Sequence, residues 1–273
     1  MQQLIQYKNE QITVFESKLY KTTSTVIQTE DCILVVDPNL LPNEVETIRQ
    51  YVDEIQNGRP IYLLFTHSDW DHIVGYGAFP EAKVIASETF SKRQNKDEII
   101  EQIHAFDDQY YIDRPYPITY PIVDEVVTSD GQQLDIGNTK LTFYNAKGHT
   151  DDGIFTVIEP LGIWIAGDYL SDLEFPFMYS SSEDYIATLQ KTDKILQTHQ
   201  INLLIPGHGH VTENEYDIIR RKNDGLNYIQ QLKSAIHNNT EHLHILDGYH
   251  YKRSLKDCHD ENVEFLMKEL NQP

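Results

Sequence analysis

The sequence contains little cysteine, few basic residues and no long apolar run. Its two cysteines, Cys32 and Cys258, cannot form a disulfide framework. Lysine and arginine number 22 against 43 aspartates and glutamates, and the formal charge of −21 disfavours nucleic acid, anionic membranes and polyanionic substrates as partners. No run of about 18 apolar residues occurs, so no transmembrane helix is expected. These absences favour a small-molecule substrate as the partner, with no nucleic acid and no membrane.

The start of the chain and its composition predict a cytoplasmic protein. Residues 1–8 lack the apolar stretch of a secretory signal peptide. An apolar content of 40% over 273 residues is enough for a sizeable core. We expect one domain spanning residues 1–273. The apolar segment 173–179 could form either a pocket wall or the contact of a homodimer.

Two successive sets of strands and helices are predicted from alternation, short apolar runs and helical spacing. The first set comprises strands at 12–16, 23–28, 32–36, 61–65 and 83–87, with helices from 42 to about 56 and from 73 to 79. The second comprises strands at 126–127, 133–136, 141–144, 154–158, 163–166 and 202–205, with helices at 183–198, 213–237 and 263–270. Gly225 could interrupt the helix at 213–237. Two α/β halves that pack sheet against sheet would explain the repetition.

Residues 88–122 form a segment without a clean period. Its later part, between residues 110 and 121, is rich in tyrosine and proline. An insertion of this kind could be a lid over a pocket, and the alternative is an ordinary packed connection.

The residues around which the chain is organised lie directly after the apolar strand 61–65. Four potential metal ligands, His67, Asp69, Asp71 and His72, follow its carboxyl end, where layered α/β folds usually place their sites. Side chains alternate along an extended segment, so His67 and Asp69 share one side. Taken singly, Asp71 could be a helix N-cap and His67 a surface histidine. All four together after a buried strand favour a metal site.

Three further candidate ligands follow other predicted strands. His149, Asp168 and His208 each lie beside a glycine, which lets the backbone approach a metal or substrate closely. Imidazole suits zinc, iron and nickel, while carboxylate suits harder cations. Seven such groups could hold two metal ions with one shared carboxylate. The remaining histidines in the C-terminal part are expected to be surface or locally bonded residues: His210, His242, His244, His250 and His259.

In this order the ligands resemble the motif of the metallo-β-lactamase fold superfamily, H-x-H-x-D-H followed by a lone histidine, an aspartate and a last histidine. The resemblance runs from about residue 23 to about residue 210. It implies an α/β fold, a four-layer αββα sandwich of two mixed β-sheets flanked by helices. It also implies two divalent metal ions, with zinc favoured over other metals. The implied ligands are His67, Asp69 and His149 for one ion, Asp71, His72 and His208 for the other, and Asp168 between them, with Asp37 hydrogen-bonded to the ligand loop.

The chemistry that the resemblance implies is metal-dependent hydrolysis. A metal-bridged hydroxide would attack a small ester, thioester, lactone or phosphoester, and Asp71 would be the catalytic residue that helps to orient it. A true β-lactamase is less favoured because no export signal is present. An RNA-processing nuclease is less favoured because of the charge of −21.

The chain departs from the family motif at Asp69, where the motif has histidine. An additional carboxylate lowers the charge of the site, which favours iron or manganese relative to zinc. A carboxylate also stands at that position in the flavodiiron group. The alternative function is therefore a diiron redox or oxygen-binding protein that resembles the flavodiiron metal domain. A third hypothesis is a binding module that has lost activity.

Overall fold

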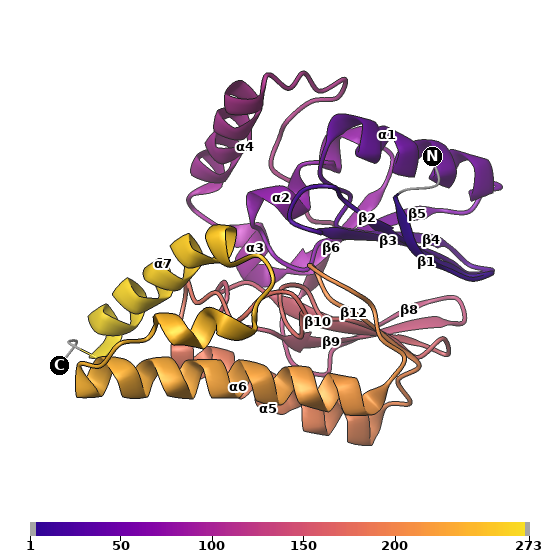
Figure 1. Ribbon diagram of the computed structural model, residues 1–273. Helices are drawn as coiled ribbons and strands as arrows, with labels where there is room; N and C mark the ends of the chain where they lie inside the picture. The colour runs from indigo at the N-terminus through magenta and orange to yellow at the C-terminus, as the bar shows by residue number, and fades with distance from the viewer. Residues whose placement is uncertain (1–3, 271–273) are drawn as a thin grey trace.

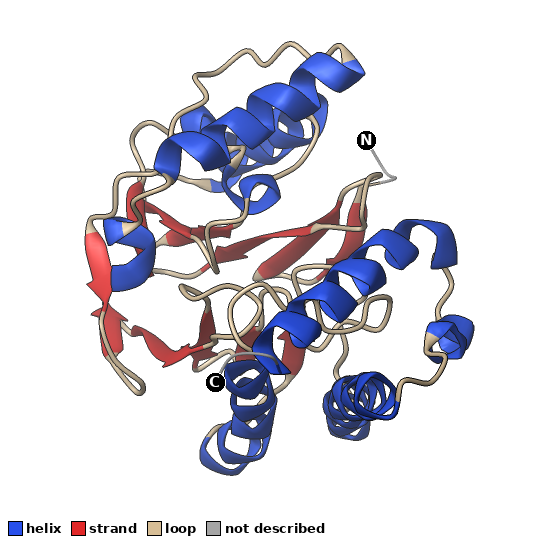
Figure 2. Cartoon of the chain, turned by 90° about the vertical axis from the view of Figure 1, so that its left-hand side faces the viewer, coloured by secondary structure: helices blue, strands red, loops and turns tan. Residues whose placement is uncertain are grey.

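Two β-sheets packed face to face form the centre of the molecule, with helices on the outer face of each (Figures 1 and 2). The computed structural model describes residues 4–270. The layers run helix, sheet, sheet, helix, and both sheets contain parallel and antiparallel pairs. The predicted four-layer αββα sandwich of two mixed sheets is confirmed.

The first sheet has seven strands in chain order, β1 to β7. Strands β1 to β4 pair antiparallel, and β4 to β7 pair parallel. The strands are β1 (Ile5–Lys8), β2 (Ile12–Glu16), β3 (Thr23–Gln28), β4 (Ile33–Val36), β5 (Ile61–Leu64), β6 (Lys83–Ser87) and β7 (Glu125–Val127). The same half contains α1 (Pro42–Ile55), α2 (Trp70–Ile73), η1 (Tyr76–Ala78), α3 (Glu88–Lys92) and α4 (Lys96–Tyr110).

The second sheet has five strands in the order β12–β11–β10–β9–β8. Only β11 and β12 pair parallel in it. The strands are β8 (Gln133–Ile136), β9 (Thr139–Asn145), β10 (Ile154–Glu159), β11 (Ile163–Ile165) and β12 (Leu203–Ile205). The helices are α5 (Ser182–Thr198), α6 (Glu215–Asn238), η2 (Leu243–Gly248) and α7 (Lys252–Leu270). Helices α5 and α6 lie beneath this sheet in Figure 1, and α7 crosses one end of the sandwich in Figure 2.

Apolar side chains fill the three spaces between the layers. Leu64 and Phe143 belong to the cluster between the two sheets. Val45 and Phe65 pack between the first sheet and its helices, and Trp164 belongs to the cluster under α5 and α6. Because both faces of each sheet are covered, the central strands are continuous apolar runs, and this is the pattern that predicted them.

Two helices occupy the segment in which no regular element was predicted. In α4 the buried residues are Ile99, Ile103 and Phe106, at the spacing of one helix face. Phe106 packs against Trp70 of α2, with ring centroids 4.7 Å apart. The helical spacing at 96–110 is followed directly by a proline-rich loop, and a pattern taken over 88–122 as a whole therefore has no clean period.

The first and second sets of strands divide at a later point than predicted. Val126 of β7 pairs with Ala86 of β6, so β7 completes the first sheet instead of beginning the second. The helix predicted at 73–79 is two short elements, α2 and η1, and α2 starts three residues earlier than the prediction.

Helix α6 is continuous through Gly225, contrary to the interruption considered for it. A Cβ at Gly225 would lie 3.1 Å from Cδ1 of Leu189 in α5, so glycine there permits the close packing of the two helices. Helix α7 begins at Lys252, well before the predicted start at 263.

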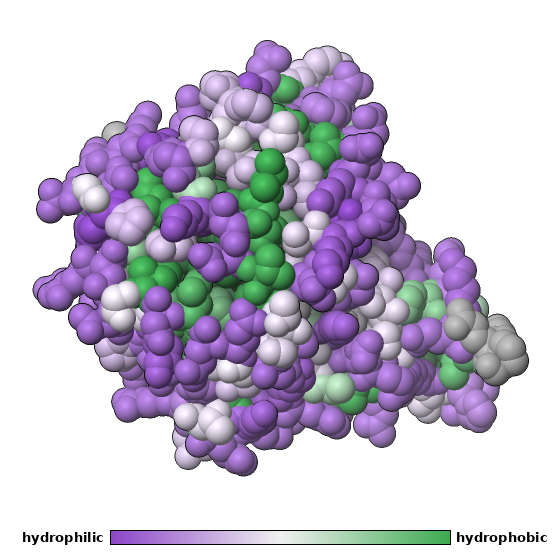
Figure 3. Space-filling view, turned by 180° about the vertical axis from the view of Figure 1, so that it is seen from behind, coloured by the Kyte–Doolittle hydropathy of each residue, from purple (hydrophilic) through white to green (hydrophobic). Residues whose placement is uncertain are grey.

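Within residues 4–270, no helix has both the length and the apolar content needed to cross a membrane. Seen from behind, most of the surface is hydrophilic, and hydrophobic residues gather in one central band (Figure 3).

Candidate metal centre

The seven predicted ligands come together from four loops of the two halves. His67 follows β5, Asp69 is the N-cap residue of α2, and Asp71 and His72 lie in that helix. His149, Asp168 and His208 follow β9, β11 and β12. The reading of Asp71 as an N-cap is wrong, because Asp69 holds that position, without a side-chain capping hydrogen bond. His67 is buried and is not a surface histidine.

Two glycines allow these loops to approach one another. A Cβ at Gly207 would lie 2.2 Å from Oδ1 of Asp168. Gly148 has a φ of +122°, and a Cβ there would lie 2.2 Å from the backbone nitrogen of Tyr185. A larger residue at either position would displace a ligand loop, so glycine is a steric requirement beside His149 and His208.

Asp168 lies in the middle of the cluster. Its Oδ1 is 3.1 Å from Nε2 of His72. Its Oδ2 is 3.3 Å from Nε2 of both His149 and His208 and 3.7 Å from Nε2 of His67. One carboxylate therefore faces all four imidazoles.

The other two carboxylates each face one side of the cluster. Oδ2 of Asp69 is 3.6 Å from Nε2 of His67, and Oδ2 of Asp71 is 3.5 Å from Nε2 of His208. Three groups have ligand atoms that all lie within 4.8 Å of one another: His67–Asp69–His149, Asp71–His72–His208 and His67–His72–Asp168. Each of these groups could hold a metal ion.

Every histidine of the cluster uses its Nδ1 atom for a hydrogen bond to a group outside the cluster. The acceptors are Thr66 Oγ1 for His67 (2.9 Å), Asp37 Oδ2 for His72 (3.0 Å), the Phe177 carbonyl for His149 (2.8 Å) and the Tyr20 carbonyl for His208 (2.9 Å). Because Nδ1–H is the donor in each bond, Nε2 carries the lone pair and faces the centre.

Asp37, at the end of β4, holds the first ligand loop from behind. Its Oδ1 accepts a hydrogen bond from the backbone N–H of Thr66 (2.9 Å), and its Oδ2 accepts one from the Thr66 hydroxyl (2.6 Å). The same Oδ2 accepts the bond from His72. Thr66 then accepts the bond from His67, so one buried carboxylate orients two imidazoles.

The inward-facing atoms have no hydrogen-bond partner among residues 4–270. Nε2 of His67, His72 and His149 and Oδ1 of Asp168 are buried and form no hydrogen bond. Buried polar atoms are costly to leave without a partner. A bound cation would satisfy all of these atoms at once, so the donor set fits divalent metal ions.

The charges around these atoms favour a cation in the same place. Burial opposes a charge on His72, but the nearby carboxylates of Asp168 and Asp71 raise its pKa. Burial also opposes a charge on His208, whose pKa the carboxylates of Glu174 and Asp168 raise to about 10. The same carboxylate field would attract a metal ion to the imidazole nitrogens.

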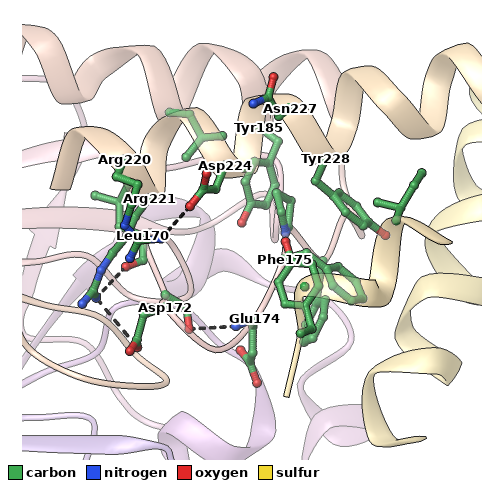
Figure 4. A pocket seen from close by; sticks show the side chains of 18 of the residues that line it. Leu170, Asp172, Glu174, Phe175, Tyr185, Arg220, Arg221, Asp224, Asn227 and Tyr228 are labelled. Atoms are coloured by element: carbon green, nitrogen blue, oxygen red, sulfur yellow. Dashed lines mark hydrogen bonds and ion pairs between the residues drawn. The ribbon is translucent and has the colours of Figure 1, made fainter. Parts of the chain in front are cut away.

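Aromatic side chains and a cavity border the centre. The ring of Tyr179 lies 5.2 Å from that of His149, centroid to centroid. A cavity of about 350 Å³ has Asp168 and Glu174 in its wall and extends to α6, as Figure 4 shows. Burial above all raises the pKa of Glu174 to about 7, and the charge of Asp168 adds to the effect.

Apart from Asp37, sequence reasoning did not find the residues that orient the candidate ligands. The acceptors at Tyr20 and Phe177 are backbone carbonyl groups, which every residue has, so the residue type does not predict them. The hydroxyl of Tyr169 accepts a hydrogen bond from the N–H of His149 (2.9 Å). Thr66 was identifiable only by its place beside His67. Of the histidines outside the cluster, His259 is fully buried and hydrogen-bonded to His242, which fits the expectation of a locally bonded residue.

Comparisons with known proteins agree with this geometry. The family model described as metallo-beta-lactamase superfamily matches residues 18–212. A metallo-beta-lactamase type 2 from Bacillus sp. (strain 170) is 24% identical over 206 residues, which cover 72% of this chain and 70% of that protein. The matched segment covers most of the chain and includes all seven residues of the cluster.

Two solved structures show the same fold at low sequence identity. A metallo-beta-lactamase family protein from Thermus thermophilus is 15% identical and has a TM-score of 0.65, with 96% of this chain and 94% of that chain covered. A stereoselective inverting sec-alkylsulfatase from Pseudomonas sp. is 12% identical and has a TM-score of 0.66, with 88% of this chain but only 44% of that chain covered. The match of the family model over residues 18–212 shows that this chain belongs to the metallo-beta-lactamase superfamily.

Proposed function

We propose that the protein is a metal-dependent hydrolase of small, uncharged carboxylic esters, thioesters or lactones. Membership of the superfamily supports metal-dependent hydrolysis in general. The observation that carries the proposal is the inward orientation of four imidazole Nε2 atoms around the carboxylate of Asp168, three of them buried without a hydrogen-bond partner.

The proposed ligand sets divide the cluster into two positions that share Asp168. His67, Asp69 and His149 would hold one ion, and Asp71, His72 and His208 the other. Bound there, divalent ions would lower the pKa of a coordinated water and polarise the electrophilic carbon of the substrate. We propose zinc first, with iron or manganese favoured by the additional carboxylate of Asp69.

Asp71 is the residue that we propose to orient the nucleophile. Its side chain is only 13% exposed, and Oδ2 lies 3.5 Å from His208 and 3.7 Å from His72. One carboxylate oxygen can therefore face the metal position while the other accepts a hydrogen bond from the attacking group. This arrangement holds the nucleophile in place before substrate arrives, which is how positioning lowers a barrier.

The partners of the three carboxylates of the centre support an uncharged substrate. Within residues 4–270, the ion pairs of Asp69, Asp71 and Asp168 are with histidines alone. The ring of Tyr179 lies against that of His149, and Trp70 stands between Asp69 and Asp71 in the sequence. A phosphate or sulfate group would find no fixed cation among these pairs, whereas an acyl group with an apolar tail could pack on the aromatic rings.

The test is a hydrolysis panel with metal-loaded protein. Protein loaded with zinc, manganese or iron would be assayed against carboxylic esters, thioesters and lactones, with phosphomonoesters and phosphodiesters as separate arms. We expect turnover of a carboxylic substrate that is lost with a chelator and in Asp71→Ala. Asp135→Asn, which changes an exposed carboxylate of β8, is the matched control and should retain full activity.

Two results would contradict the proposal. One is the absence of turnover with every metal although both positions are filled, and the other is full turnover in Asp71→Ala. Turnover of phosphoesters alone would reject the uncharged substrate class. A redox-active iron centre that hydrolyses nothing would instead select the diiron alternative.

A further inference from the structure

A buried polar side chain of α7 forms two hydrogen bonds to the backbone of the loop that orients His149. Asn262 is fully buried. Its Nδ2 donates a hydrogen bond to the carbonyl of Pro176 (2.6 Å), and its Oδ1 accepts one from the N–H of Met178 (2.9 Å). The two backbone partners lie on either side of Phe177. One side-chain amide therefore fixes the peptide segment whose carbonyl accepts the bond from His149 at 2.8 Å.

Three more polar residues continue this contact away from the metal centre. Nδ2 of Asn262 also donates to the hydroxyl of Tyr228 (3.0 Å). That hydroxyl lies 2.8 Å from Nδ1 of His259, and Nε2 of His259 lies 2.8 Å from Nδ1 of His242. We call the four residues Asn262, Tyr228, His259 and His242 the α7 chain. It runs from Asn262 of α7 to Tyr228 of α6, back to His259 of α7, and on to His242, the residue before η2.

The direction of every hydrogen bond in the α7 chain follows from the backbone. The N–H of Met178 must donate and the carbonyl of Pro176 must accept, so the orientation of the Asn262 amide is determined. Tyr228 accepts from that amide, and the acceptor available for its own proton is Nδ1 of His259. His259 then carries its proton on Nε2 and donates to His242. All the buried polar groups are satisfied in this one arrangement.

The α7 chain is not needed merely to attach α7. Leu255, Val263 and Leu266 bury apolar surface from the same helix. A separate hydrogen bond joins Ser182 and Glu269 near its end. Apolar residues in place of the four polar ones could dock the helix equally well, because buried polar groups confer position more than stability. The ring of Phe175 stacks on Tyr228 with centroids 4.4 Å apart and adds a further contact between the loop and α6 (Figure 4).

Of the outer hydrogen bonds made by the four histidines, only that of His149 goes to the loop that the α7 chain holds. His72 and His208 donate their outer hydrogen bonds to Asp37 and Tyr20, neither of which belongs to the α7 chain or to the loop that it holds. The family model ends at residue 212, before all four residues of the α7 chain in the sequence. The α7 chain therefore comes entirely from the part of the molecule outside the family segment.

We propose that Asn262, held by Tyr228, His259 and His242, is a positioning residue for His149, through which the C-terminal helices set the metal affinity of the His67–Asp69–His149 position. The proposal rests on the metal binding described under the proposed function and goes beyond it. Outer partners of ligating histidines tune both ring orientation and metal affinity. Here that partner is the backbone carbonyl of Phe177, and its position is set by the side chain of Asn262. Asn262 therefore determines the orientation of the His149 ring.

The test is the affinity of the two positions for Co²⁺ in Asn262→Leu, which keeps the side-chain size but loses both backbone hydrogen bonds. Affinities would be measured by competition with a chelator, following the visible absorption of bound Co²⁺. We expect one of the two affinities to fall about tenfold, at the lower end of the range for outer partners of ligating histidines, and the other to stay unchanged. In the Co²⁺-loaded variant, the shifted N–H signal of one ligating imidazole should exchange faster with solvent.

Leu266→Ala is the matched control, because it weakens the docking of α7 without touching the α7 chain. It should lower thermal stability and leave both affinities unchanged. Equal affinity losses in the two variants, or no loss in Asn262→Leu, would overturn the proposal. If Asn262→Leu does not fold, Tyr228→Phe replaces it. We then expect a smaller loss of Co²⁺ affinity, confined to one metal position. No loss, or an equal loss at both positions, would contradict the proposal. Co²⁺ affinity is measured without substrate, so a failure of the proposed hydrolysis leaves this test intact.

Discussion

Asp69 and His149 meet across the metal centre, with Oδ2 of Asp69 3.1 Å from Nε2 of His149. This is closer than the 3.6 Å between the same oxygen and His67, the neighbour of Asp69 in sequence. Burial alone would raise the pKa of Asp69, but the adjacent imidazoles of His149 and His67 hold it well below its usual range. The residue that departs from the family motif is therefore an anion directed at the same point as two imidazoles.

The first prediction is that Asp69→His changes metal selection. A neutral imidazole removes one negative charge from a centre with three carboxylates, so the site should favour zinc more strongly over iron or manganese. The variant should contain zinc at a higher zinc-to-iron ratio than the original protein when both are expressed in the same medium. Elemental analysis of the purified proteins measures this ratio.

Activity alone cannot decide this prediction, since the larger imidazole could reduce turnover by poor fit. The ratio must be read in folded protein, together with a structure of the loaded site. An unchanged ratio, with the Asp69 carboxylate turned away from both ions, would show that Asp69 is not a ligand.

The second prediction concerns Asp168, which faces all four histidines. Asp168→Ala should lose metal at both positions and abolish hydrolysis, because a carboxylate shared between two ions supports both of them. Metal content per chain and turnover measure the effect. His244→Ala, which changes an exposed histidine of η2, is the control and should affect neither. His259→Ala would be a poor control because that side chain is fully buried. Two ions retained in Asp168→Ala would exclude the shared role.

That the candidate ligands lie together could be predicted from sequence because they follow the ends of apolar strands. Strands β5, β11 and β12 are short apolar runs, and His67, Asp168 and His208 follow them within a few residues. Strand ends on one side of a layered fold converge, so order along the chain was enough to bring these residues together. The same apolar runs predicted the two sheets.

The supports of the ligands could not be predicted in the same way. His149 and His208 are oriented by the carbonyl groups of Phe177 and Tyr20, and a carbonyl group is present in every residue. Asn262 lies 113 residues after His149, and its contact with the ligand loop depends on how α7 crosses the end of the sandwich. Such contacts are set by the packing of separate elements, which the local pattern does not contain.

The third prediction is a pH-dependent contribution of His259 to stability. Burial, and after it the charge of His242, lowers the pKa of His259 to about 4, whereas Asp260 opposes the shift. The unfolded chain has the ordinary value of about 6.5, so between these two values it binds more protons than the folded chain. The contribution is therefore complete above pH 6.5 and is lost as the pH falls towards 4, by at most about 3 kcal/mol.

The comparison that isolates this contribution is between metal-free wild-type protein and metal-free His259→Leu. The variant should be less stable at pH 7, and its deficit should shrink as the pH is lowered from 7 to 4.5. Denaturant unfolding at each pH gives the two free energies. A deficit that stays constant over this range would show that His259 does not titrate with a lowered pKa.

The fourth prediction is that Thr66→Val weakens the metal position that contains His67. The Thr66 hydroxyl donates to Asp37 at 2.6 Å and accepts from His67 at 2.9 Å, so valine keeps the volume and removes both bonds. Nδ1–H of His67 is then buried without a partner, and its ring loses the contact that directs Nε2 inward. The affinity should fall by about 10- to 100-fold, and the metal-free protein should lose about 1–3 kcal/mol of stability. Chelator competition and denaturant unfolding measure the two effects.

Thr156→Val is the matched control for this substitution. Thr156 is fully buried in β10, and its hydroxyl has no hydrogen-bond partner among the described residues. Replacing an unpaired hydroxyl by a methyl group should leave metal affinity unchanged and stability equal or higher. If both valine variants lost metal affinity alike, the loss would reflect a general loosening of the sheets. If neither did, the orientation of His67 would not depend on Thr66, and the bond from Asp37 through Thr66 to His67 would have no part in metal binding.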